Sequence, residues 1–355
     1  MDTVTIEHMP PRIETSTTRN ADVPDTPDEW AWREQLRDAV RDPDELIDLL
    51  GLPDELREGA RKAARVFPLV VPRPYLARMR RGEPDDPLLR QVLPLDVERA
   101  EAKPGYVVDP VGDRLAVREA GLLQKYRGRA LLITAGVCAV HCRYCFRRHF
   151  PYEESTARLE EGSAALRVIE RSPELEEVIL SGGDPLMRSD AWLGELVAGL
   201  EKIPHVRRLR VHTRLPIVIP GRVDSLLLGW LGKTRLAPTV VVHTNHPNEI
   251  DATCGDALLR LVTAGVPVLN QTVLLRGVND DAATLVELSR RLLDVRVMPY
   301  YLHQLDPVIG AAHFEVPVER GLELVGEMRT RLPGFGVPRY VREVEGAAHK
   351  IELAL

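Results

Sequence analysis

The sequence predicts an α/β fold built on a parallel sheet. From Arg129 onward, six short runs of β-branched and aliphatic residues alternate with longer stretches of helical periodicity. This alternation is typical of βαβ units, whose right-handed crossovers place successive strands parallel. Polar residues follow each run, and parallel α/β proteins build their sites at the carboxyl ends of strands. Periodicity alone leaves an open sheet and a partial barrel as alternatives.

The chain begins without a periodic pattern. Residues 1–27 are polar and rich in Thr, Pro and Asp, so we expect a disordered segment that lacks the apolar stretch of a secretory signal. Residues 28–109 are expected to form a mainly helical N-terminal region. Its clearest helix covers residues 43–50, with acidic residues in the first turn and Gly51 after its end. We assign no chemistry to this region.

The predicted core covers residues 110–336 and contains the six strands. They are expected at residues 130–134, 177–181, 209–213, 239–243, 266–272 and 295–300. Amphipathic stretches separate most of them and are expected to form helices, for example residues 191–202, 255–264 and 283–293. The polar residues after the strands should meet at one edge of the sheet, which predicts one large site for several ligands.

The C-terminal segment, residues 337–355, contains two β-leaning runs. Residues 337–344 and 351–355 are largely apolar, and Gly346 between them allows a tight turn. A hairpin of this kind would hold Lys350 over the mouth of the predicted site. Taken alone, a lysine so near the end of the sequence would instead be a mobile surface residue.

Composition and charge exclude several classes of protein. The sequence has 355 residues, of which 44% are hydrophobic and 28% charged, as in an ordinary globular enzyme. Its net charge of −6 argues against binding to nucleic-acid phosphates, which requires a basic surface. No apolar run approaches the roughly 18 residues of a membrane span. We therefore expect a cytoplasmic protein that binds neither nucleic acid nor membrane.

The cysteines give the most specific signal. Cys138, Cys142 and Cys145 lie within eight residues, whereas Cys254 stands alone. Three thiolates from one loop can hold three irons of a [4Fe–4S] cluster and leave the fourth iron open to a chelating ligand. A structural zinc with His141 or His149 is the alternative, but zinc ligands usually come as two separated pairs. The spacing favours iron–sulfur. Cys254 falls in a predicted helix and should be a buried small hydrophobe.

Several motifs accompany the cysteines. They are residues 136–151, 180–186, 214–220, 269–276 and 299–303, together with residues 42–46 and 85–92. With these motifs the sequence resembles the lysine 2,3-aminomutase family of radical S-adenosylmethionine (SAM) enzymes over about residues 28–353. It is most similar to the short bacterial branch that makes β-lysine for the modification of elongation factor P. The resemblance implies a partial (β/α)6 barrel and the conversion of α-lysine to β-lysine.

The resemblance also implies three cofactors and their residues. Cys138, Cys142 and Cys145 match the ligands of a [4Fe–4S] cluster whose open iron is chelated by SAM. The positions that match the SAM site are Ser181, Gly182, Gly183, Asp184, His243 and Gln271. Lys350 matches the catalytic lysine that forms a Schiff base with pyridoxal 5′-phosphate (PLP), and Tyr126 and Arg129 match positions near the PLP phosphate.

The substrate assignment follows from the same resemblance. Arg147 matches the residue that holds the substrate carboxylate, and Asp306 and Glu343 match two acids that hold the distal ammonium of lysine. Two acids disfavour glutamate as substrate, because like charges repel, but leave arginine as an alternative. A zinc-stabilised binding adaptor is the alternative from another class, and the acidic net charge and polar strand ends speak against it. The partners implied are the substrate lysine, whether free or protein-bound, a reducing donor such as flavodoxin or ferredoxin, an elongation factor P ligase that takes β-lysine, and a homo-oligomer.

Overall fold

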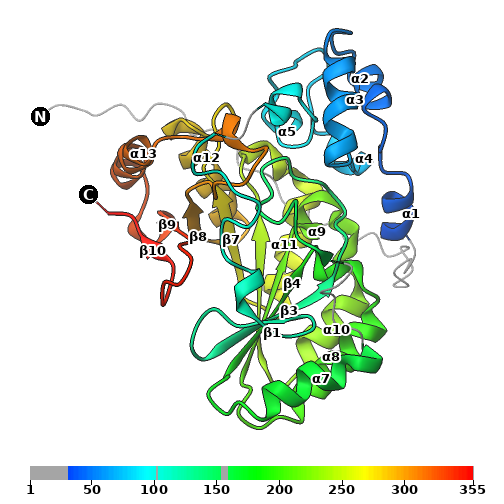
Figure 1. Ribbon diagram of the computed structural model, residues 1–355, viewed down its shortest axis with the longest axis vertical. Helices are drawn as coiled ribbons and strands as arrows, with labels where there is room; N and C mark the ends of the chain where they lie inside the picture. The colour runs from blue at the N-terminus through cyan, green and yellow to red at the C-terminus, as the bar shows by residue number, and fades with distance from the viewer. Residues whose placement is uncertain (1–30, 101–102, 153–158, 355) are drawn as a thin grey trace, which may run out of the picture.

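The computed structural model describes residues 31–100, 103–152 and 159–354. The segment expected to be disordered, residues 1–27, lies outside the described residues. The described chain forms a ten-stranded sheet whose strands follow the order of the sequence, β1 to β10 (Figure 1). The first and last strands do not pair, so the sheet is curved but open, and the expected partial barrel is confirmed.

The parallel part of the sheet contains six strands at the predicted places, although the last two begin two and three residues later than predicted, at Val268 and Met298. They are β3 (Arg129–Ala135), β4 (Glu177–Gly182), β5 (Arg208–Thr213), β6 (Ala237–His243), β7 (Val268–Val273) and β8 (Met298–His303). A further strand, β9 (Arg339–Arg342), pairs parallel to β8. At the opposite edge, β1 (Val117–Glu119) and β2 (Leu122–Leu123) pair antiparallel and join β3.

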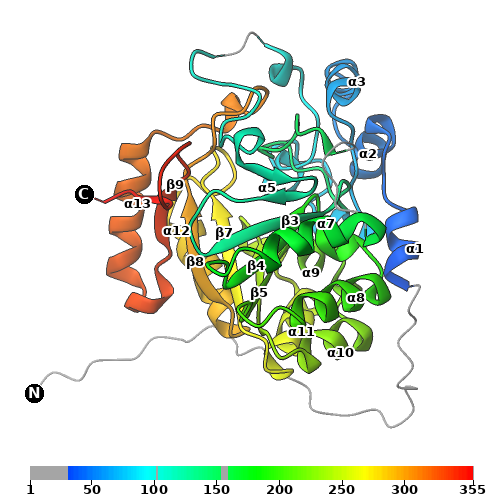
Figure 2. The same cartoon turned by 60° about the horizontal axis from the view of Figure 1, so that its bottom comes forward.

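Helices cover the outer face of this sheet (Figure 2). They are α7 (Leu159–Glu170), α8 (Asp190–Glu201), α9 (Leu215–Val218), α10 (Ser225–Lys233), α11 (Ala252–Thr263), α12 (Ala282–Asp294) and α13 (Val318–Arg331). Several begin at a side chain that accepts a hydrogen bond from the first turn, for example Ser189 before α8 and Asp251 before α11. Cys254 is fully buried on α11, as expected for a structural cysteine. No helix in the described ranges has the length and apolar character needed to cross a bilayer.

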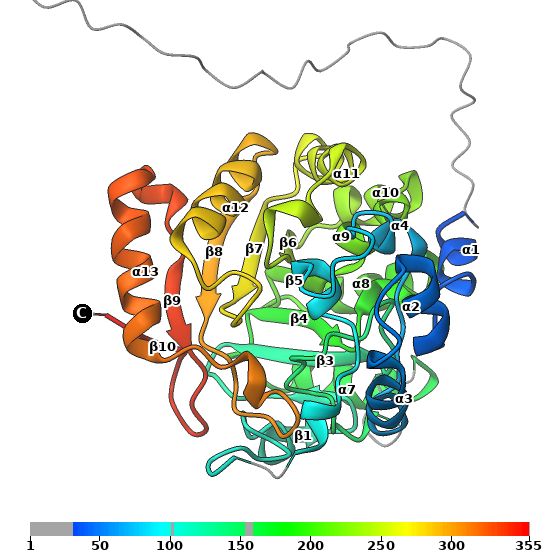
Figure 3. The ribbon, with the colours of Figure 1, turned by 90° about the horizontal axis from the view of Figure 1, so that it is seen from above.

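The N-terminal helices pack against one side of the barrel (Figure 3). They are α1 (Ala31–Arg37), α2 (Pro43–Leu50), α3 (Leu56–Val66), α4 (Arg73–Leu76) and α5 (Pro87–Arg90). The boundaries predicted for α2 are confirmed, because Asp42 caps its start and Gly51 ends it with a φ of +63°. Leu46 and Leu89 belong to the same hydrophobic cluster as Val211 in the sheet, so the region shares the core of the barrel.

Short 3-10 turns connect many of these elements. They are η1 (Asp96–Arg99), η2 (Arg114–Ala116), η3 (Pro185–Met187), η4 (Pro220–Arg222), η5 (Pro247–Glu249), η6 (Ala312–Phe314) and η7 (Gly334–Gly336). The chain ends in β10 (Ile351–Glu352), which pairs antiparallel with β9 through Ile351 opposite Arg342. The predicted C-terminal hairpin is thereby confirmed, with Gly346 at a φ of +74° in its connection. This pairing fixes the backbone next to Lys350.

Candidate active site

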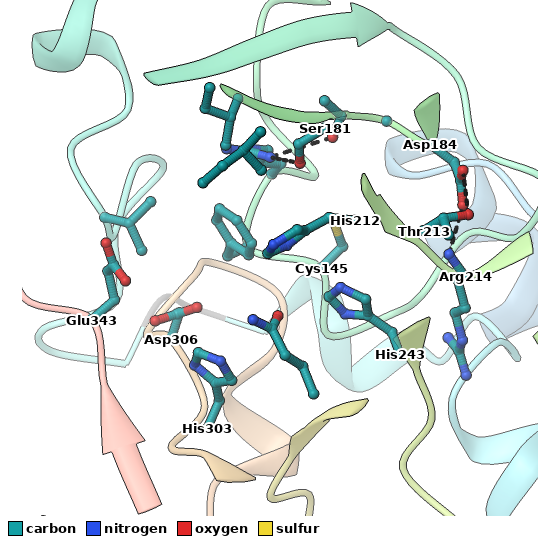
Figure 4. A pocket seen from close by; sticks show the side chains of 18 of the residues that line it. Cys145, Ser181, Asp184, His212, Thr213, Arg214, His243, His303, Asp306 and Glu343 are labelled. Carbon is teal, nitrogen blue, oxygen red and sulfur yellow. Dashed lines mark hydrogen bonds between the residues drawn. The ribbon is translucent and has the colours of Figure 1, made fainter. Parts of the chain in front are cut away.

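A cavity of about 300 Å³ lies at the carboxyl ends of the parallel strands (Figure 4). It is lined by residues from β3 through β8 and from the C-terminal hairpin. All the predicted site residues line it: Tyr126, Arg129, Cys138, Cys142, Cys145, Arg147, Ser181, Gly182, Gly183, Asp184, His243, Gln271, Asp306, Glu343 and Lys350. The fold therefore brings together the groups that the sequence separates by more than half of its length.

The cysteine loop follows β3. Its turn is closed by a hydrogen bond of 3.0 Å from the Cys145 nitrogen to the Cys142 oxygen. Burial, followed by the neighbouring thiol of Cys142, raises the pKa of Cys145 to about 11. Burial also raises the pKa of Cys138 well above the ordinary value of a thiol. Half-buried thiols of this kind become thiolates when a strong cation balances their charge, which fits ligands of an iron–sulfur cluster.

The geometry favours iron–sulfur over the zinc alternative. His141 and His149 are not among the residues that line the cavity. His141 Nδ1 lies 2.8 Å from the Pro68 oxygen, and His149 Nε2 lies 3.1 Å from the Ile309 oxygen. Among the described residues, no group of three or more His, Cys, Asp or Glu side chains is arranged to hold a single metal ion. A [4Fe–4S] cluster takes each thiolate on a different iron and does not need such a group.

The N-terminal region holds the cysteine loop, a role that the sequence analysis missed. The Arg143 side chain is fully buried and donates to both oxygens of Glu98, at 2.9 and 2.6 Å. Arg148 donates to the same carboxylate at 2.7 Å. The backbone nitrogen of Arg143 donates to the Gln91 oxygen at 2.9 Å. The two arginines that flank Cys145 in the sequence could have indicated this role, because buried guanidinium groups require carboxylate partners.

The turn after β4 contacts the chain that follows β3 and the end of β5. Gly182 has a φ of +117°, and at Gly183 an added Cβ would lie 2.4 Å from the Val137 oxygen. Glycine is required here because the start of the cysteine loop occupies the space of a side chain. Asp184 accepts hydrogen bonds from Thr213 Oγ1 at 2.7 Å and from the Arg214 nitrogen at 2.7 Å. Its carboxylate therefore joins β4 to the end of β5 from a position on the cavity wall.

Arg147 is fixed by a buried acid. Its Nε donates to Asp113 Oδ2 at 2.6 Å, and its Nη1 donates to Ser181 Oγ at 3.2 Å. Lys125 Nζ lies 2.6 Å from Asp113 Oδ1. Although burial opposes ionisation, Arg147 and Lys125 hold the pKa of Asp113 below its ordinary value. Asp113 is thus a constant anion that orients Arg147, and no local sequence pattern marks it.

The far end of the cavity combines a lysine with two acids. Lys350 Nζ forms an ion pair with Glu343, whose Oε1 accepts a hydrogen bond of 2.5 Å from Tyr126 Oη. The Arg129 guanidinium stacks on the Tyr126 ring at 4.5 Å from its centre. Asp306 lies beside Glu343 (Figure 4). Burial, with a contribution from the Glu343 charge, raises the pKa of Asp306 to about 7 despite the opposing effect of Lys350.

Three histidines line the space between these ends. Burial lowers the pKa of His243 to about 4, and it lowers the pKa of His212 and of His303 well below the ordinary value. The Nε2 atoms of His212 and His303 are buried without a hydrogen-bond partner among the described residues. Neutral imidazoles with such atoms fit a polar ligand in the cavity. His212 and His303 stand at predicted strand ends, so the sequence carried the signal that would have added them to the site.

Comparison with known proteins agrees with this architecture. Residues 132–227 match the family model of the radical SAM superfamily. The chain is 48% identical to the L-lysine 2,3-aminomutase of Escherichia coli (strain K12), across 93% of this chain and 96% of the relative. It is 43% identical to the enzyme of that name from Haemophilus influenzae, across 91% and 95%. It is 34% identical to that of Clostridium subterminale, across 90% and 76%. The chain therefore belongs to the lysine 2,3-aminomutase family of radical SAM enzymes.

Proposed function

We propose that this protein is a lysine 2,3-aminomutase that uses a [4Fe–4S] cluster, SAM and PLP to convert α-lysine to β-lysine. The observation that carries the proposal is the single cavity that joins the three-cysteine loop to Lys350. The names of the relatives support an amino-group migration, and the acids around Lys350 support a cationic substrate.

The residues present fit these cofactors. The three thiols that line the cavity suit the cluster, and the unpartnered His212 and His303 nitrogens, with Gln271, suit the polar groups of SAM and PLP. Arg129 and Tyr126 offer a cation and a hydroxyl group near Lys350, as a phosphorylated pyridine requires. When bound, the cluster and SAM supply hydrogen-atom abstraction, and PLP supplies an electron sink for the migrating nitrogen.

The chain's own residues position the substrate. Arg147, oriented by Asp113, would bind the lysine carboxylate through its guanidinium group. Asp306 and Glu343 would bind the distal ammonium group, since both carboxylates line the same end of the cavity. Burial strengthens these ionic interactions and excludes water from the reacting atoms.

Glu343 has a second task toward Lys350. A lysine must be a neutral amine before it can react with an aldehyde. Glu343 contacts Lys350 Nζ directly, and although burial opposes ionisation, this contact holds the pKa of Glu343 below its ordinary value. The carboxylate therefore binds Lys350 as an ammonium, whose proton leaves to solvent when the amine reacts. The ammonium of the substrate could then replace that of Lys350 as the partner of the Glu343 carboxylate.

The proposal includes the setting of the reaction. The resemblance to the short bacterial branch supports delivery of β-lysine to an elongation factor P ligase in the cytoplasm. A flavodoxin or ferredoxin would reduce the cluster. We also propose the division of the chain into a helical region at residues 28–109, a catalytic core at residues 110–336 and a C-terminal segment at residues 337–355. That division rests on the order of the elements along the chain.

Product analysis tests the proposed function. Enzyme reconstituted with iron, sulfide, SAM and PLP would be reduced and given lysine, arginine or glutamate in separate anaerobic reactions. We expect β-lysine from lysine and no product from glutamate. Efficient conversion of arginine alone would assign the site to the arginine alternative. Absence of any β-amino acid from enzyme that holds the cluster, SAM and PLP would overturn the proposal.

A further inference from the structure

A buried arginine contacts one of the three cysteine sulfurs. Arg214 follows β5, and its Nη1 lies 2.7 Å from Cys142 Sγ. Its backbone nitrogen is held by Asp184, as Figure 4 shows. The residue is 7% exposed, so water does not screen its charge effectively. A charged donor in this position acts directly on the sulfur.

The guanidinium group is fixed by three partners from two parts of the fold. Its Nη2 donates to Glu249 Oε2 at 2.8 Å, to Gln91 Oε1 at 2.7 Å and to Tyr75 Oη at 3.2 Å. Tyr75 and Gln91 belong to the N-terminal region, whereas Glu249 lies in η5 after β6. The arginine is therefore held in one orientation by residues outside the cysteine loop.

Glu249 and Cys142 contact different nitrogens of the Arg214 guanidinium group. Glu249 binds Nη2, whereas Cys142 Sγ is bound by Nη1. Glu249 Oε1 accepts further hydrogen bonds from the backbone nitrogens of Asn245 and His246, at 2.9 and 3.1 Å. The carboxylate thus balances the buried charge through a different nitrogen from the one that meets the sulfur. Cys142 has a guanidinium N–H group as its immediate neighbour.

We propose that Arg214 raises the reduction potential of the cluster through its hydrogen bond to Cys142 Sγ, and that Glu249, Gln91 and Tyr75 are positioning residues for it. The inference rests on the cluster assigned under the proposed function. Hydrogen bonds to ligating sulfurs and local charge help to set the potential of an iron–sulfur cluster. Reduction adds negative charge, which a neighbouring cation stabilises. Arg214 thereby makes the cluster easier to reduce by a biological donor.

Two substitutions should move the potential in opposite directions. Arg214→Met removes the cation, so the cluster should be reduced only at more negative potential. Glu249→Gln keeps an acceptor for the guanidinium group but removes the opposing negative charge, so the potential should become less negative. Arg214→Lys keeps a charge without the fixed geometry and should give an intermediate value.

The matched control is Arg222→Met. Arg222 is also fully buried and pairs with Asp190 at 2.9 Å, but it lies in η4 and is not among the residues that line the cavity. Its loss should lower the stability of the protein and leave the cluster potential at the wild-type value. The comparison separates loss of a buried arginine from loss of this particular contact.

The measurement is a redox titration of the reconstituted holoenzymes, followed by electron paramagnetic resonance, first without SAM and then with it. At equal iron content, we expect the reduction potential to be more negative in Arg214→Met and less negative in Glu249→Gln than in the wild type. Both shifts should already be present without SAM. Cluster-loaded Arg214→Met and Glu249→Gln enzymes that both keep the wild-type potential without SAM would overturn the inference. A wild-type protein that forms no iron–sulfur signal would instead contradict the cluster assignment itself.

Discussion

Lys350 and Glu343 form an ion pair in the C-terminal hairpin, and the hydroxyl group of Tyr126 donates a hydrogen bond to Glu343. The family resemblance implies a cofactor role for Lys350 and a substrate role for Glu343, and the two side chains are in contact. Glu343 is 7% exposed and Lys350 is 24% exposed, so the pair is largely shielded from water. Under the proposed function, cofactor loading and substrate binding therefore depend on the same carboxylate.

The cysteine assignment predicts a selective loss of metal. Cys142→Ala should lose the cluster, because each of the three thiolates binds its own iron. Cys254→Ala should keep it, since Cys254 is buried on α11 away from the cavity lining. Iron and sulfide analysis checks both variants, with about four of each expected per chain in the control. A Cys142→Ala protein with the full iron content would disprove the assignment.

Substitution of Glu98, which lies outside the barrel, should strongly affect both stability and cluster retention. Glu98→Ala leaves the buried Arg143 and Arg148 without their shared carboxylate. Removal of one partner from a buried ion pair costs roughly 3–5 kcal/mol, so both the free energy of unfolding and cluster retention should fall. Denaturant unfolding and iron analysis measure the two effects. Glu58→Ala, which breaks an exposed pair with Lys62, should behave like the wild type.

Substitution of Asp306 should have opposite effects on the stability and on the activity of the protein. Because its pKa is about 7 in the folded chain and lower in the unfolded chain, the folded state holds a proton that the unfolded state loses. The stability of the wild type should therefore fall as pH rises from about 4 to about 7. Asp306→Asn removes this loss and should be more stable at pH 8, by roughly 2–4 kcal/mol at most.

The same substitution should abolish efficient lysine turnover, since the distal ammonium loses a charged partner. Unfolding of cofactor-free protein at several pH values, together with steady-state kinetics of the holoenzyme, measures both effects. Wild-type turnover by Asp306→Asn would show that the proposed substrate pose is wrong.

We expect lysine turnover to require the guanidinium group of Arg147 and not only its positive charge. Arg147→Lys keeps the charge but cannot donate to Asp113, Ser181 and a substrate carboxylate in the same arrangement. We expect kcat/KM for lysine to fall about 30-fold or more, which corresponds to a loss of about 2 kcal/mol. Asp113→Asn should change kcat/KM in the same direction, whereas Arg208→Lys, which alters an exposed pair with Glu176 and does not line the cavity, serves as the control. Equal kinetics for Arg147→Lys and the wild type would refute the carboxylate assignment.

Much of the fold could be predicted because the signals are local. The parallel strands β3 to β8 and the hairpin of β9 and β10 follow from apolar runs and turn residues. The polar strand ends located the cavity, since parallel strands deliver their last residues to one edge. The contacts of Glu98, Asp113 and Gln91 could not be predicted. They join positions that are distant in sequence, and a single carboxylate or amide has no periodic pattern.

The cofactor role of Lys350 is tested most directly by borohydride reduction of the PLP-loaded enzyme, followed by peptide mapping. Two lysines line the cavity near Glu343: Lys350 contacts its carboxylate, and Lys125 Nζ lies 3.7 Å from it. We expect the reduced adduct on Lys350, and we expect Lys350→Ala to lose the adduct while it keeps the iron–sulfur cluster. An adduct on Lys125, or a Lys350→Ala enzyme that still traps PLP at the wild-type level, would contradict it.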